Sequence, residues 1–162
     1  MKSIFAAVFL FVVSALAQGI SVAIPAEGDT LMAGQSTDVE LDFPNSLTGV
    51  EHVSVVISYV ACSVTPCSNN ASITMGSTLY AGNYTPIIGG DPAKPPNQNI
   101  SVTLPSGMAG GQTLLNVAHF YLLGASATPI LEYANVTVNL DNSTSTSNAA
   151  RFIRGREAPK LG

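Results

Sequence analysis

The stretch TLLNVAHFYLL, residues 113–123, decides the fold of this 162-residue chain. Apolar residues occupy both of its alternating positions, which is typical of a β-strand covered on both faces. A buried helix is the competing interpretation, but no helix-capping pattern precedes the stretch. Gly110, Gly111 and Gly124 bracket it at the length of a strand, so we expect a strand inside a sheet.

Stretches on either side alternate apolar residues with polar or small ones, which predicts half-buried strands. They lie at residues 20–24, 37–43, 52–59, 100–104 and 134–140. Turn residues separate them, and no amphipathic helix is evident after the N-terminal segment. The sequence therefore predicts an all-β fold, an immunoglobulin-like β-sandwich of about seven strands.

Two of these stretches predict which side chains face outward. In residues 37–43 the acids occupy the polar parity, and we expect them to be solvated on the outer face: Asp38, Glu40 and Asp42. In residues 52–59 the expected inner set is Val53, Val55, Ile57 and Tyr59. The opposite parity holds His52, Ser54 and Ser58, so His52 is expected to face solvent.

The N-terminal segment has the features of a signal peptide. Lys2 precedes an apolar run from Ile4 to Val13, and Ala15-Leu16-Ala17 has the small-x-small spacing of a cleavage site. A membrane anchor is the alternative, but the run is too short to span a bilayer. We expect a signal peptide at 1–17, a sandwich at 18–141, and a flexible Ser/Thr-rich and basic tail at 142–162. These features predict a secreted, extracellular protein without a membrane anchor.

The cysteines and the glycosylation motifs fit this compartment. Cys62 and Cys67 are expected to form a disulfide that closes a short loop. A redox or metal role is the alternative, but two cysteines without a nearby histidine do not make a tetrahedral site, so no metal is expected. Five Asn-x-Ser/Thr triplets predict N-glycosylation, at Asn70, Asn83, Asn99, Asn135 and Asn142.

Composition and charge exclude several classes of function. The chain is 46% hydrophobic and only 10% charged, which is inconsistent with disorder. Between Gln18 and Ser147 there is one basic residue, Lys94, against nine acidic ones. Nucleic-acid binding needs a basic face, and we expect none here.

A search for catalytic residues finds no convincing set. There is no Gly-x-Ser-x-Gly motif, and His119 lies in the most apolar strand, where a packed or edge histidine is expected rather than a general base. The predicted first residue of the mature chain is Gln18, so the N-terminal His ligand of fungal copper oxygenases is missing. Asp38, Glu40 and Asp42 leave a pair of hydrolytic carboxylates open. We expect no enzyme, no catalytic residue and no cofactor.

Several segments together resemble a known family. They are Gly19–Pro25 with Gly34-Gln35, Leu79–Gly82, and above all Phe120–Pro129 leading to Asn135–Val138. This pattern is similar to that of the fungal necrosis-inducing secreted protein family. The resemblance implies a small, non-enzymatic effector that triggers plant cell death and suppresses immunity by binding host receptor-associated immune kinases. It carries over no kinase-contacting residue.

Loops held on a rigid scaffold are the expected contact regions for such a partner. The candidates are the Pro-rich stretch Asp91–Pro96 and the loops that flank Gly124. Two other interpretations stay open: a structural β-sandwich protein of the fungal cell wall or matrix, and a secreted hydrolase. The sequence does not determine the oligomeric state.

Overall fold

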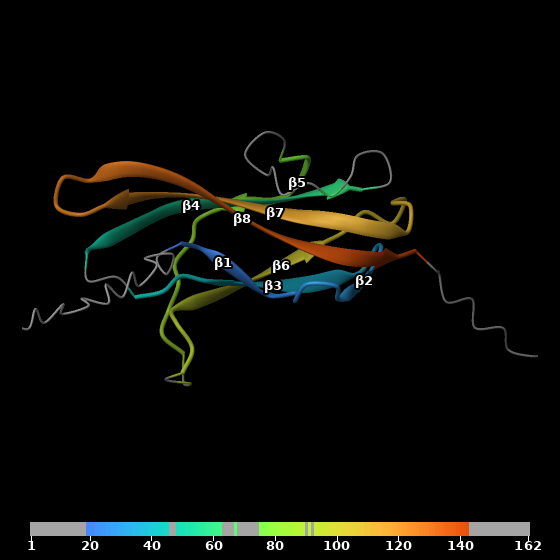
Figure 1. The fold of residues 1–162 in the computed structure, drawn as a ribbon, viewed down its shortest axis with the longest axis horizontal. Helices are drawn as coiled ribbons and strands as arrows, with labels where there is room; N and C mark the ends of the chain where they lie inside the picture. The colour runs from blue at the N-terminus through green and yellow to red at the C-terminus, as the bar shows by residue number, and fades with distance from the viewer. Residues whose placement is uncertain are drawn as a thin grey trace, which may run out of the picture.

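The computed structural model describes residues 19–45, 48–62, 67, 75–89, 91 and 93–142. Eight strands run through these residues and form two facing sheets (Figure 1). In chain order they are β1 (Ser21–Ile24), β2 (Thr30–Met32), β3 (Ser36–Asp42), β4 (Val50–Ala61), β5 (Ser77–Gly82), β6 (Asn97–Thr103), β7 (Gly111–Leu123) and β8 (Thr128–Asp141).

The smaller sheet has the order β1-β3-β6, and the larger has the order β2-β8-β7-β4-β5. All neighbours are antiparallel except β2, which pairs with β8 in parallel. The predicted all-β sandwich is therefore confirmed, with eight strands where about seven were expected. The alternation of apolar and polar residues did not predict β2 and β5, which have only 3 and 6 residues and few buried side chains.

The core lies between the inner faces of the two sheets. The smaller sheet contributes fully or nearly fully buried side chains from β3 and β6, namely Val39, Leu41, Ile100 and Val102. The larger sheet meets them with Val55, Ile57 and Val117. Burying aliphatic side chains of this size stabilises a fold by roughly 1.5–3 kcal/mol each, so this layer holds the sandwich together.

The predicted interior strand is β7, which lies between β8 and β4. Its outer face is buried near its beginning, at Leu114 and Asn116, and half-buried further along, at Ala118. The carbonyl of Met75 accepts hydrogen bonds there from the Asn116 amide, at 3.3 Å, and from the Ser58 hydroxyl. Towards its end, Phe120 is half-buried.

A β-bulge in β4 reverses one of the predicted faces. His52 pairs with Tyr121 and Ser54 pairs with Phe120, so Val53 is an extra residue in the ladder. The bulge turns His52 toward the core and leaves Val53 38% exposed. The prediction that His52 faces solvent and Val53 faces inward is therefore wrong.

The expectation that all three acids of β3 are solvated is also wrong. Glu40 is only 5% exposed, because the loop before β6 folds back over it. The ammonium of Lys94 lies 2.6 Å from Glu40 Oε1. Asp42 is half-buried, and burial, followed by the charge of Glu40, raises the pKa of its carboxyl. Asp38 alone is exposed as expected.

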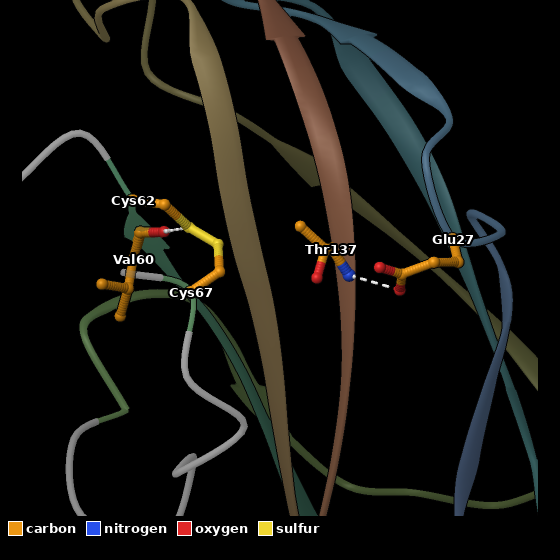
Figure 2. The surroundings of a disulfide bond; sticks show 5 residues. All are labelled: Glu27, Val60, Cys62, Cys67 and Thr137. Carbon is orange, nitrogen blue, oxygen red and sulfur yellow. Dashed lines mark hydrogen bonds between the residues drawn. A yellow bond between two sulfur atoms is a disulfide. The ribbon is translucent and has the colours of Figure 1, made fainter. Parts of the chain in front are cut away.

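The disulfide between Cys62 and Cys67 is present at the end of β4, with a Cα–Cα distance of 5.1 Å (Figure 2). The Cys62 amide donates to Gln112 O at 2.9 Å, which ties the bridge to β7. Figure 2 also shows the carboxylate of Glu27, in the loop between β1 and β2, accepting from the Thr137 amide of β8 at 2.8 Å.

The predicted signal peptide, most of the predicted tail and Asn70 lie outside the described residues. Within the described part of the chain, no helix is long and apolar enough to cross a membrane.

Candidate functional site

Both predicted contact regions meet at one end of the sandwich, around the start of β4. Pro96 reaches it from the Pro-rich loop, and the β7–β8 turn, Gly124–Ala127, reaches it from the other side. The Gly124 amide donates to Gly49 O at 2.8 Å, which fixes the turn against this segment. We call this end, from Thr48 to Glu51 with its flanking loops, the loop surface.

Two hollows lie on the loop surface. The first has a volume of about 200 Å³ and is lined by Phe43, Pro44, Thr48, Gly49, Val50, His52, Pro86 and Pro96. The second has a volume of about 460 Å³ and is lined by Gly49, Val50, Glu51, Leu122, Gly124, Ala125 and Ala127. Gly49 and Val50 line both hollows, so the hollows are neighbours and one partner can contact both.

The β7–β8 turn has a defined conformation. Gly124 has a φ of 72° and Ala127 a φ of 49°, the left-handed region that a residue with a Cβ rarely adopts. The Ala127 amide donates to Gly124 O at 3.0 Å and closes the turn. Ala125 and Ser126 are exposed at its tip, where a partner can reach them.

Beneath the first hollow, three polar side chains form a hydrogen-bonded chain across the larger sheet. His52 comes from β4, His119 from β7 and Glu132 from β8. His52 Nδ1 lies 3.0 Å from His119 Nε2, and His119 Nδ1 lies 2.8 Å from Glu132 Oε1. The amide of Ile20 also donates to this carboxylate oxygen, at 3.0 Å. We call this set the Glu–His–His chain.

Burial and aromatic rings shield most of the Glu–His–His chain from water. The side chain of His119 is 0% exposed and that of Glu132 is 18% exposed. Phe43 and Tyr84 make edge contacts with both imidazoles. Tyr121 stacks on His119 with ring centroids 4.9 Å apart. The Tyr84 hydroxyl donates to Leu41 O at 2.9 Å, and burial raises its pKa.

The same surroundings determine the charge of His52. Burial lowers its pKa from 6.5 to about 4; the nearby His119 adds to this effect and Glu132 opposes it. His52 is therefore neutral at neutral pH. The prediction of a packed His119 is confirmed, because this side chain is fully buried.

The sequence did not indicate that the two histidines meet, or that Glu132 orients one of them. One signal was available: Glu132 has the same parity as Ala134, Val136 and Val138, which form the inner face of β8. A carboxylate on an apolar face needs a polar partner. Among the described residues, no group of three or more His, Cys, Asp or Glu side chains could hold a metal ion.

The predicted glycosylation sites differ in their exposure. Asn83, Asn99 and Asn142 are exposed, while Asn135 is half-buried on β8. The Asn142 amide nitrogen also lies 3.5 Å from Met108 O. Glycosylation at these positions stays a prediction.

Comparisons with known proteins give two curated relatives, both named necrosis-inducing secreted protein 1. The protein from Colletotrichum higginsianum is 29% identical over 143 residues, which cover 88% of this chain and 91% of that protein. The protein from Colletotrichum orbiculare is 28% identical over 81 residues, or 46% of this chain. That match spans only half the length of the Colletotrichum orbiculare protein.

Among solved structures, the fibronectin(III)-like modules of Clostridium thermocellum CbhA match with a TM-score of 0.40 and 6% identity. The match covers 76% of this chain and 96% of that chain, and it supports no conclusion about function.

The family comparison covers most of the sandwich. The model of the Nis1 family matches residues 13–139, from the predicted signal peptide to the last strand. This range contains the Glu–His–His chain and the whole loop surface. The chain thus belongs to the Nis1 family of necrosis-inducing, secreted, effector-like proteins.

Proposed function

We propose that this protein is a secreted fungal effector that modulates plant immunity or cell death by binding a host receptor-associated immune kinase, without an enzymatic step. The observation that carries the proposal is the family membership over residues 13–139. The name of the relatives, necrosis-inducing secreted protein, supports an action outside the fungal cell.

The loop surface is the best candidate for the contact. Both hollows lie there, its prolines restrict the backbone, and the fixed β7–β8 turn adds exposed side chains. A rigid surface loses little conformational entropy when it binds. The acidic body, with Lys94 as its one basic residue between Gln18 and Ser147, favours a partner with a basic patch. Such charge complementarity increases the association rate and makes binding sensitive to salt.

The proposal can be tested by expressing residues 18–162 in leaf tissue behind a plant secretion signal, beside an unrelated secreted β-sandwich. The readouts are the elicitor-triggered oxidative burst and the co-precipitation of receptor-associated kinases. We expect a reduced burst and recovery of a kinase. A normal burst without kinase would contradict the proposal, and recovery in fungal wall extracts would then favour a structural wall protein.

A matched pair of variants tests the contact surface. Ala125→Arg places a large charged side chain in the exposed β7–β8 turn, while Ala109→Arg places the same side chain in an exposed loop before β7. The two positions lie beyond opposite ends of one strand. We expect Ala125→Arg to abolish kinase recovery and Ala109→Arg to leave it unchanged. Equal behaviour of the two variants would remove the loop surface as the contact.

A further inference from the structure

The Glu–His–His chain determines which nitrogen of His52 carries a hydrogen. Glu132 Oε1 accepts from the Ile20 amide at 3.0 Å, and His119 Nδ1 lies 2.8 Å from the same oxygen, so Nδ1 carries a hydrogen. In the neutral pair, His119 Nε2 is then an acceptor. His52 Nδ1, 3.0 Å away, must donate to it. The other nitrogen of His52, Nε2, is left with a free lone pair.

This lone pair is on the side of the first hollow. His52 lines the hollow, and its Nδ1 is turned away toward His119. None of the described residues hydrogen-bonds to His52 Nε2. This atom is also absent from the unpaired polar atoms that are fully buried in the described part of the chain. It is therefore not sealed off from solvent, and because His52 lines the hollow, its lone pair is available to a donor there.

The rest of the lining is mostly apolar and stiff. Phe43 and Val50 contribute apolar side chains, and three prolines contribute rings with little conformational freedom: Pro44, Pro86 and Pro96. The volume of about 200 Å³ is below that of typical small-molecule sites, roughly 300–1,000 Å³. It suits one aromatic side chain, which at protein interfaces often fills such a pocket as an anchor.

We propose that the first hollow receives a tyrosine side chain of a protein partner, whose phenol hydroxyl donates to His52 Nε2. The proposal rests on the proposed function, because it requires a protein partner. The ring of the tyrosine packs against Phe43 and the prolines, and its hydroxyl supplies the donor that the imidazole lacks. Phenylalanine fits the same space but leaves Nε2 without a partner.

Three soluble probes test the hydrogen bond directly: N-acetyl-tyrosinamide, its O-methyl ether and N-acetyl-phenylalaninamide. Each is titrated into the 15N-labelled protein at pH 8.0, above the ordinary histidine pKa of roughly 6.5. We expect tyrosinamide to shift the signals of Val50 and His52 with a Kd about two- to tenfold lower than that of the other two. The O-methyl ether is the matched control, since it keeps the ring and the oxygen but cannot donate.

A second measurement needs no probe and no variant. Long-range 1H–15N spectra of the histidine rings distinguish the two neutral tautomers. We expect His52 to carry its hydrogen on Nδ1, which is the less common form in water. A hydrogen on Nε2 at pH 8.0 would overturn the proposal, as would equal affinity for the three probes or the absence of any shift at Val50 and His52.

These outcomes are separate from those of the leaf assay. If a kinase is recovered but tyrosinamide binds no better than its O-methyl ether, the anchor proposal fails and the proposed function stands. If tyrosinamide binds as expected but no kinase is recovered, the hollow accepts tyrosine from a partner of another kind.

Discussion

Replacing Glu132 with alanine is the sharpest test of the Glu–His–His chain. The substitution removes the acceptor of His119 Nδ1–H, which is fully buried, and also that of the Ile20 amide. An unsatisfied buried donor costs about 1–3 kcal/mol, and the loss of a second hydrogen bond about 1 kcal/mol. We therefore expect Glu132→Ala to lower the free energy of unfolding by about 2–4 kcal/mol.

Two control variants test whether the loss of stability comes from the buried hydrogen bonds of Glu132 rather than from removing a carboxylate in general. Glu132→Gln keeps an oxygen acceptor in the same place and should cost only about 1 kcal/mol. Glu27→Ala removes another carboxylate that accepts from a β8 amide, at Thr137, but Glu27 is exposed. Water can satisfy the amide there, so we expect a loss below about 1 kcal/mol.

The assay is equilibrium unfolding in urea, followed by far-UV circular dichroism because the chain has no Trp. The midpoint and slope give the free energy of unfolding for each variant. A Glu132→Ala variant within about 0.5 kcal/mol of the wild type would refute the reasoning, since that is the usual range for surface substitutions. Equal losses for Glu132→Ala and Glu132→Gln would refute the role assigned to the acceptor.

Three further predictions concern pH, the disulfide and glycosylation. The pKa of His52 is about 4 in the folded protein against 6.5 ordinarily, so between these values the unfolded chain binds more protons than the folded one. The free energy of unfolding therefore falls as the pH is lowered from 6.5 to 4. Because His52 is partly exposed, we expect this loss of unfolding free energy to be about 1–2 kcal/mol. In urea unfolding between pH 6.5 and 4, a His52→Asn variant should lose that much less stability than the wild type. Replacing Cys62 and Cys67 with Ser should lower the free energy of unfolding by about 2 kcal/mol in the same assay, because the loop that the disulfide closes is short. A loss above about 4 kcal/mol would mean that the disulfide also stabilises structure outside this loop. Glycopeptide mass spectrometry of the secreted protein should find higher occupancy at the exposed Asn99 than at the half-buried Asn135, and the reverse order would contradict the assigned faces.

The alternation of apolar and polar residues was enough to predict most of the fold. It identified five of the strands, because buried and exposed side chains alternate along a strand, and the apolar residues on both parities of residues 113–123 identified a sixth as an interior strand. The sequence also singled out the Pro-rich stretch and the loops around Gly124, which flank the loop surface, while a partner contact there stays a prediction. That these two regions lie on either side of Gly49 could not be predicted, because it depends on the hydrogen bond from Gly124 to Gly49, which are far apart in the sequence.

The errors have specific causes. A single extra residue in β4 reverses the alternation, and no residue type marks the bulge, so the sequence placed His52 and Val53 on the wrong faces. Glu40 has the parity of an outer residue, but the loop that carries Lys94 pairs with it, and it is buried. Both errors concern polar groups whose partners are distant in sequence, and the Glu–His–His chain was missed for the same reason.

The parallel pairing of β2 with β8 has a consequence for the order in which the protein is made. The chain passes from the smaller sheet through β2 in the larger sheet and back to β3, while Leu31 pairs with Leu140. Synthesis from the N-terminus produces β2 long before β8, and non-local pairing of this kind is slow to form. β1 can pair with β3 early, but β2 has no strand partner other than β8 in the described part of the chain, so it stays unpaired until nearly all of these residues have been translated. Any truncation before residue 139 leaves β2 without its partner strand.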